Sequence, residues 1–180
     1  AGSTWQEDEE LLVNYINNNA SLDDKFIIAP HNIKQEAIIE LQKSINKRTI
    51  LFSDKFDKNL KEYQVFIIDT IGILTKIYAA ADLGYVGGGL KTGLHNILEP
   101  ATFGIPVVIG NKYEKFKEAV DLVKIGGCIS IKNQEEFTAN FISLKKDDNF
   151  RKLTGVINKR YIKDHLGATK LVMNYLKDKI

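Results

Sequence analysis

The chain has one cysteine in 180 residues, Cys128, so it cannot form an internal disulfide, and a reducing compartment fits it. Its three histidines do not cluster with cysteine at metal-ligand spacing, which argues against a metal centre. No apolar run approaches the ~20 residues that a membrane-spanning helix needs. The 25 Lys and Arg nearly balance the 23 Asp and Glu, and a net charge of +2 gives no strong attraction to nucleic acid.

What the chain does contain is typical of a globular protein, with 44% hydrophobic and 27% charged residues. Its length fits one domain, residues 1–180. Ala1 to Thr4 lead directly into a predicted helix, with Ser3 or Thr4 as its cap. No strand is predicted before that helix, although an α/β domain usually has one there. We therefore expect a piece of a longer protein, or else a cloning scar at Ala1–Ser3.

Short apolar runs alternate with segments of helical spacing along nearly the whole chain. The runs predict strands at 26–29, 49–52, 65–68, 83–86, 106–109 and 128–131. Helices are predicted at 4–19, 33–44, 72–80, 95–103, 115–124, 134–144, 150–163 and 168–177. This pattern indicates an α/β fold, a Rossmann-like parallel sheet with helices on both faces. Such sheets bind ligands at the carboxyl ends of their strands, so the loops after the strands are the candidate sites.

The densest signal is a glycine-rich turn, Gly87 to Gly89, directly after a predicted strand. Glycines permit positive φ and close approach of the backbone to a ligand. A helix predicted from Leu94 or His95 would add an anion site at its N-terminus, and Lys91 would add a charge. The turn matches neither GxxxxGK[ST] nor GxGxxG at the first strand. The alternative is a tight turn that holds no ligand.

His95 and Glu99 are four residues apart, so on that helix they would share a face. The Glu99 carboxylate could then accept two hydrogen bonds from a ribose, with His95 and Asn96 near a phosphate. Alternatively, Glu99 is a surface acid or pairs with His95. His31 follows a predicted strand and could reach the same cleft or be an ordinary loop residue. Trp5 is assigned to core or interface packing. Asp69 or Thr70 is expected as a helix N-cap, the alternative being a loop whose backbone holds a base or phosphate.

These motifs together resemble a known family, the 3-deoxy-D-manno-octulosonic acid (Kdo) transferases. The resemblance runs in order from residue 2 to about 168, and its glycine-to-HNILEP block is highly specific. The matching segments are GST at 2–4 with DE at 8–9, APH at 29–31, DTIGIL at 69–74, IYAAAD at 77–82, YVGGG at 85–89, GLHNILEP at 93–100, FGIPV at 103–107 and GAT at 167–169.

The resemblance implies one half of a two-domain GT-B glycosyltransferase, the C-terminal half that binds the donor CMP-Kdo. The residues expected to bind it are Pro30, His31, Ile71, Gly72, Gly87, Gly88, Gly89, Lys91, Gly93, His95, Asn96 and Glu99. The N-terminal half, absent from this chain, would bind a lipid A precursor and carry the acidic base. The resemblance therefore implies no catalytic residue, no metal and no cofactor in this chain, which alone would transfer no sugar.

It further implies a role in lipopolysaccharide synthesis at the cytoplasmic face of the bacterial inner membrane. Membrane contact would come from the missing half, and this domain would itself be soluble. Nucleic acid is not an expected partner.

The sequence departs from the family pattern at four positions near the expected site. The arginine of the family's PRH is missing before His31, its glutamate and methionine in DTMGEL are Ile73 and Ile71, and its GST-His is Trp5. His31 could take over from the absent arginine. A GT-B transferase or epimerase that uses a UDP-sugar, and a non-catalytic nucleotide-binding or interaction module, remain alternatives.

Overall fold

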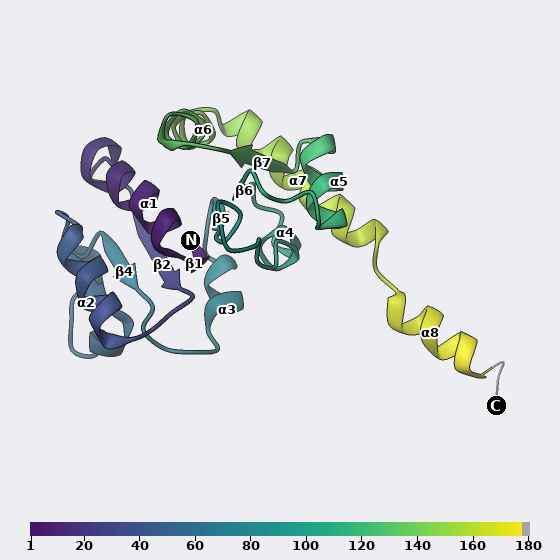
Figure 1. Ribbon diagram of the computed structural model, residues 1–180, viewed down its shortest axis with the longest axis horizontal. Helices are drawn as coiled ribbons and strands as arrows, with labels where there is room; N and C mark the ends of the chain where they lie inside the picture. Colours follow the sequence, from purple (N-terminus) through teal and green to yellow (C-terminus); the bar gives the residue numbers. More distant parts are fainter. Residues whose placement is uncertain (178–180) are drawn as a thin grey trace.

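The structure is a computed structural model, and it describes residues 1–177. Its centre is a parallel sheet of seven strands in the order β3-β4-β2-β1-β5-β6-β7 (Figure 1). The strands are β1 (Gly2–Thr4), β2 (Phe26–Pro30), β3 (Thr49–Leu51), β4 (Val65–Ile67), β5 (Gly84–Val86), β6 (Val107–Gly110) and β7 (Cys128–Ile131). The six strands expected from the sequence are all present, and every pairing is parallel. The predicted fold class is confirmed.

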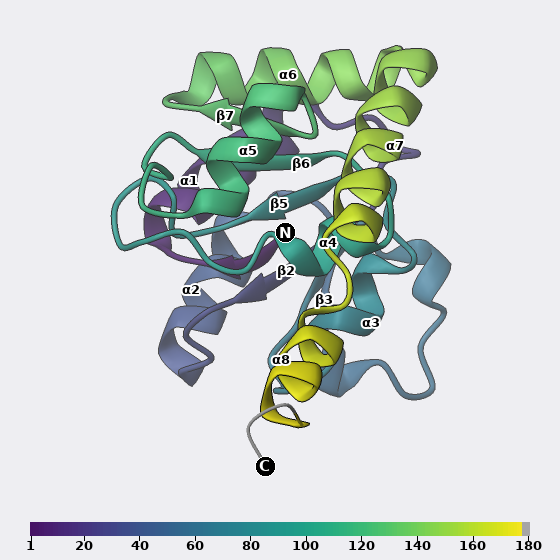
Figure 2. The same cartoon turned by 90° about the vertical axis from the view of Figure 1, so that its right-hand side faces the viewer.

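Helices cover both faces of this sheet, as expected. They are α1 (Gln6–Asn19), α2 (Gln35–Ser44), α3 (Leu74–Tyr78), α4 (Leu98–Thr102), α5 (Lys117–Ile125), α6 (Gln134–Lys146), α7 (Asp148–Asp164) and α8 (Ala168–Lys177). Two single turns of 3-10 helix, Phe52–Asp54 and Leu60–Glu62, follow β3. The last helix, α8, projects from the body (Figure 2). Within residues 1–177, no helix is both long and apolar enough to cross a membrane.

Successive residues of the strands contribute alternately to two separate hydrophobic cores, one on each face of the sheet. Val108 packs with side chains of α1, α2 and α6, whereas its neighbours Val107 and Ile109 pack with side chains of α4 and α5. Because both faces are covered, the strands are apolar throughout, which explains why they were recognisable in the sequence. Cys128 lies in the second core, as predicted, and burial raises the pKa of its thiol to about 12.

The prediction that the chain runs straight into a helix is wrong, because Gly2–Thr4 forms β1 in the middle of the sheet. Gly2 pairs with Ala29 of β2 on one side and Val86 of β5 on the other. A side chain at Gly2 would collide with the buried hydroxyl of Tyr78. The strand escaped prediction because its position requires small residues rather than an apolar run.

The start of α1 also differs from the prediction. Trp5, not Ser3 or Thr4, occupies the N-cap position, with an extended backbone. Its amide donates to the Asp8 carboxylate at 2.9 Å, which satisfies one of the free N–H groups at the helix start. Thr4 instead donates its hydroxyl to Glu9 at 2.9 Å.

Two further helix starts were placed wrongly. The helix after the glycine turn begins at Leu98 rather than Leu94 or His95, because the Asn96 side chain accepts the Leu98 N–H at 3.0 Å. His95 therefore precedes the helix and shares no helical face with Glu99. Asp69 is no N-cap either, since α3 begins at Leu74. Its carboxylate instead accepts from the amide and hydroxyl of Ser53, at 3.0 and 2.5 Å.

The strand order reverses direction at β1, because β2 lies on one side of it and β5 on the other. In parallel α/β sheets, such a switch point opens a crevice at the carboxyl ends of the two diverging strands. Here those ends lead to Trp5, after β1, and to the glycine turn, after β5. The fold therefore places the most specific motif of the sequence at its expected ligand crevice.

The backbones of the loops after β5 and at the end of β6 touch at Gly89 and Gly110. A Cβ added to Gly110 would lie 2.2 Å from the carbonyl carbon of Gly89. Because that carbon belongs to the backbone, it cannot move aside as a side chain could. We therefore expect Gly110→Ala to lower the free energy of unfolding by about 1–3 kcal/mol or more in urea denaturation. Ser143→Ala, at an exposed position of α6, is the control and should stay within about 0.5 kcal/mol. Equal stability of both variants would contradict the close approach.

Candidate functional site

The Asp8 carboxylate, on the first turn of α1, organises the switch point. It is 1% exposed. One oxygen accepts the Tyr85 hydroxyl at 2.6 Å, and the other accepts the amides of Trp5 and Gly88, each at 2.9 Å. Burial, followed by the charge of Asp8 and this hydrogen bond, raises the pKa of Tyr85 well above its ordinary value. Asp8 thus joins the end of β1, the start of α1 and the turn after β5.

Three aromatic rings gather beside Asp8 at the carboxyl ends of β1, β2 and β5. The Trp5 indole nitrogen donates to Nε2 of His95 at 3.0 Å, and the two rings are nearly coplanar, with an angle of 12° between them. His31 stacks on both, with centroids 4.3 Å from Trp5 and 4.7 Å from His95. These distances place His31 over the junction of the other two rings. Of the two alternatives for His31, the structure thus favours the one that brings it to His95.

The surroundings of His95 favour its uncharged form. Burial lowers the pKa of its imidazole below the ordinary 6.5, and the neighbouring His31 lowers it further, while Asp8 acts in the opposite direction. The ring is only half-buried, so it still has an edge toward solvent. His31 is exposed on the outer side of the cluster.

The three successive glycines are buried, and their missing side chains make room for the protein itself. A Cβ on Gly87 would meet the carbonyl of Ser3 at 2.4 Å, and one on Gly88 would meet the carbonyl of Gly93 at 2.1 Å. Gly88 also needs its positive φ of 88°. The turn brings β1, β5 and the next loop together, which is sufficient to explain the glycines without a ligand.

Several amides of this loop already donate within the chain. Those of Lys91 and Gly93 bond the carbonyl of Gly88, and that of His95 bonds the carbonyl of Gly87. Together with the Gly88 amide on Asp8, they are not available to a phosphate. Within the described chain, the loop's remaining amide donors are those of Gly89, Leu90, Thr92 and Leu94.

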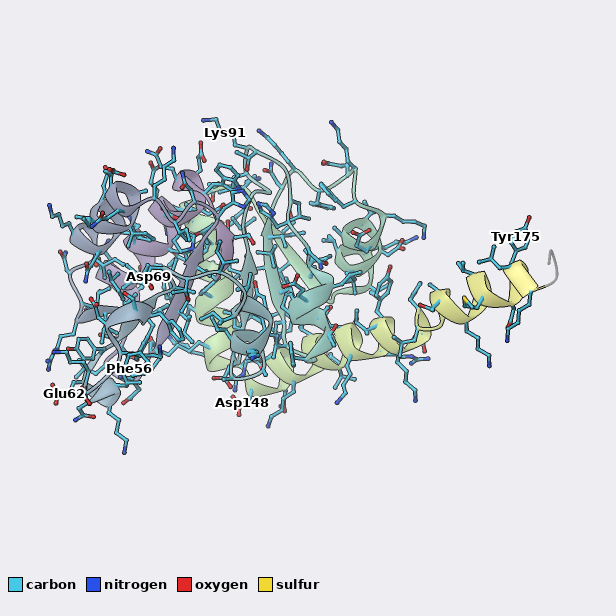
Figure 3. The ribbon with its side chains drawn as sticks, turned by 90° about the horizontal axis from the view of Figure 1, so that it is seen from below. Phe56, Glu62, Asp69, Lys91, Asp148 and Tyr175 are labelled. Atoms are coloured by element: carbon cyan, nitrogen blue, oxygen red, sulfur yellow. The ribbon has the colours of Figure 1, made fainter. Side chains whose placement is uncertain are left out.

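Lys91 lies at the surface, beyond the glycine turn (Figure 3). It forms a 2.7 Å ion pair with Glu7 of α1. The expected extra charge of the loop is therefore partly neutralised, and its attraction for an anion is weaker than the sequence suggested.

Glu99 lies beside a small surface hollow of about 220 Å³ lined by Asn96, Leu98, Glu99, Thr102 and Phe103. Its carboxylate accepts a hydrogen bond from the Asn96 side chain at 3.2 Å, so its partner within the chain is Asn96 rather than His95. Glu99 is half-buried, and its second oxygen accepts no hydrogen bond from residues 1–177.

Pro30, Ile71 and Gly72 complete the predicted set. Pro30 ends β2 immediately before His31. Ile71 and Gly72 follow β4 and are exposed, with Ile71 at 87%. Gly72 has φ of 91° with open space around it, so a side chain there would be strained without any collision. These residues share the carboxyl edge of the sheet with the ring cluster.

A larger cavity than the hollow beside Glu99 lies at the opposite edge of the sheet. It measures about 550 Å³, and its lining includes Ala1, Phe26 and Leu83, at or before the first residues of β1, β2 and β5. Cavity size therefore does not mark the predicted site. Within residues 1–177, no group of three or more His, Cys, Asp and Glu side chains could hold a metal ion.

Two residues of the site were missed from the sequence. The sequence indicates Asp8 as an acidic residue of the first helical turn and of the family's acidic pair, and it favours a packing role for Trp5, but it reveals the contacts of neither. The signal for Asp8 was its place in the first helical turn, where a carboxylate can accept the N-cap amide. No local pattern reveals the bond from Trp5 to His95, which lies 90 positions along the chain.

The three hydrogen bonds of Asp8 predict a large effect of its removal. Asp8→Ala leaves three donors without an acceptor, so the free energy of unfolding should fall by about 3 kcal/mol or more in urea denaturation. Tyr85→Phe removes one of these donors together with its need for a partner, and should cost about 1 kcal/mol. Equal losses in both variants would mean that Asp8 stabilises the fold only through the tyrosine hydroxyl.

Comparison with known proteins agrees with the motif resemblance, although no protein-family model matches the chain. The 3-deoxy-D-manno-octulosonic acid transferase of Aquifex aeolicus is 33% identical over 128 residues, covering 68% of this chain and 35% of that protein. The enzyme of the same name from Rickettsia conorii is 30% identical over 156 residues, covering 84% of this chain and 33% of that protein. The chain thus spans about a third of the length of these relatives.

The fold has a solved counterpart, the C-terminal CMP-Kdo binding domain of WaaA from Acinetobacter baumannii. The two superpose with a TM-score of 0.76 at 23% identity, over 88% of this chain and 85% of that one. At this identity, the likeness concerns the fold. Together with the sequence matches it confirms the resemblance read from the motifs: the chain is a relative of the 3-deoxy-D-manno-octulosonic acid transferases.

Proposed function

We propose that this chain is the donor-binding domain of a Kdo transferase, and that it holds CMP-Kdo at the carboxyl edge of its sheet. The observation that carries the proposal is the convergence of Trp5 and His31 at the switch point with His95, which belongs to the GLHNILEP segment. The names of the relatives and of the structural neighbour support the choice of nucleotide sugar.

In this proposal, the half-exposed side of the loop receives the donor rather than the buried glycines. His31 and His95 face the phosphate, and the amides of Gly89, Leu90, Thr92 and Leu94 are the loop's remaining backbone donors. Glu99 accepts hydrogen bonds from the ribose with the oxygen that Asn96 leaves available. The backbone around Ile71, exposed at the same edge, contacts the base.

The complete enzyme would need a second domain, which supplies the acidic base and binds the lipid A precursor. The proposal includes transfer at the cytoplasmic face of the inner membrane during lipopolysaccharide synthesis, through membrane contacts of that second domain. It requires neither a metal nor another cofactor in this chain.

Calorimetric titration with CMP and UMP tests the choice of nucleotide. The proposal expects CMP to bind more tightly than UMP, both to this chain and to the full-length protein. Preference for UMP would instead indicate an enzyme that uses a UDP-sugar. Binding of neither nucleotide to the full-length protein would indicate an interaction module and end the proposal.

Glu99→Ala tests the ribose contact in the same titration of the full-length protein. It removes up to two charge-assisted hydrogen bonds, so CMP affinity should fall about ten-fold or more. Glu135→Ala, at an exposed position of α6, is the matched control and should leave affinity unchanged. If Glu99→Ala folds and binds CMP like the parent, Glu99 is a structural acid. Gly88→Val is unsuitable for this purpose, because its side chain would collide with the Gly93 carbonyl.

A further inference from the structure

The bond between Trp5 and His95 constrains the chemistry of the histidine as well as its position. An indole N–H can only donate a hydrogen bond. Since it lies 3.0 Å from Nε2 of His95, that nitrogen must be the acceptor and must carry no proton. A neutral imidazole has one N–H, so its proton is on Nδ1.

The rest of the cluster keeps the His95 ring in this state. The His95 Cδ2 atom lies against Gly88, where any side chain would come within 3.1 Å of it. Its amide is bound to the Gly87 carbonyl, and His31 lies flat against the ring. Rotation of the ring would therefore break both a hydrogen bond and a stacking contact.

The titratable groups that bear on His95 come from two other elements. His31, at the end of β2, would place a second positive charge 4.7 Å away if both rings were protonated. Asp8, on α1, is the opposing negative charge, but both its oxygens are occupied by other donors. The lowered pKa of His95 agrees with this balance.

We propose that Trp5 is a positioning residue that holds His95 in its Nδ1–H tautomer, so that His95 offers one defined N–H donor to the phosphate of the bound nucleotide. This ligand role rests on the proposed function, whereas the tautomer does not. The phosphate is then recognised by a neutral hydrogen bond, in a site where Lys91 of the glycine-rich loop is paired with Glu7. Protonation of His95 removes the acceptor for Trp5 and makes both ring nitrogens donors.

The tautomer can be measured without any ligand by nitrogen-15 NMR of the histidine rings at neutral pH. In the parent, His95 should show a bare Nε2 and a protonated Nδ1. Trp5→Phe keeps an aromatic face for His31 but lacks the N–H, so the proton should move to Nε2 in a substantial fraction of molecules. His31→Ala is the matched control, because it removes the stacking contact and retains the Trp5 bond, and it should resemble the parent.

A protonated Nε2 in the parent at neutral pH, or an unchanged tautomer in Trp5→Phe, would overturn the proposal. If Trp5→Phe does not fold, the parent alone decides the question. The indole N–H resonance of Trp5 should shift as His95 is titrated, and a resonance that stays constant through that titration contradicts the bond.

The pH dependence of CMP binding distinguishes whether Trp5 positions the His95 proton or only packs against the ring. At pH 7.5, Trp5→Phe should bind CMP roughly 2- to 10-fold more weakly than the parent, the range for one lost neutral hydrogen bond. At a pH where NMR shows His95 charged in both proteins, the ratio should approach one, because both nitrogens then donate. A ratio that does not change with pH would make Trp5 a packing residue. Failure of the parent to bind CMP would refute the proposed function and leave the tautomer result standing.

Discussion

The buried carboxylate of Asp8 is the interaction on which the rest of the switch point depends. An anion is costly to bury unless several donors solvate it. Here the start of α1 and three hydrogen bonds, from Trp5, Tyr85 and Gly88, meet that requirement. These donors come from two separate places in the chain, Trp5 before α1 and the segment from Tyr85 to Gly88. Their shared acceptor therefore sets the distance between the end of β1 and the turn after β5, where the candidate site lies.

In the structure, the glycine-rich turn has a packing role in addition to the ligand-binding role expected from the sequence. Its residues are small because the backbone of β1, of Gly93 and of Gly110 lies against it and leaves no room for side chains. The surface that remains for a ligand is the outer part of the loop and the ring cluster beside it. The glycines therefore allow these backbone segments to pack closely. This packing positions the polar groups that a nucleotide would meet.

The ring cluster also shows how this chain accommodates its departures from the family pattern. Trp5 stands where the resemblance expects a histidine, and the arginine expected before His31 is absent. The structure places the two altered segments in contact, with His31 stacked on Trp5 and His95 hydrogen-bonded to it. Substitutions at separate places in the sequence therefore act on a single site.

The sequence alone determined the α/β class, six strands and the most specific motif, because periodicity reports which residues an element buries. It could not reveal β1, since Gly2–Thr4 is a strand only because β2 and β5 lie on either side of it. Nor could it predict the hydrogen bond from Trp5 to His95, 90 positions apart, or that from Tyr85 to Asp8, 77 positions apart. Such contacts depend on the order of the strands and on which loops that order brings together. Only the tertiary structure decides them, because no local pattern encodes which distant backbone will be the neighbour.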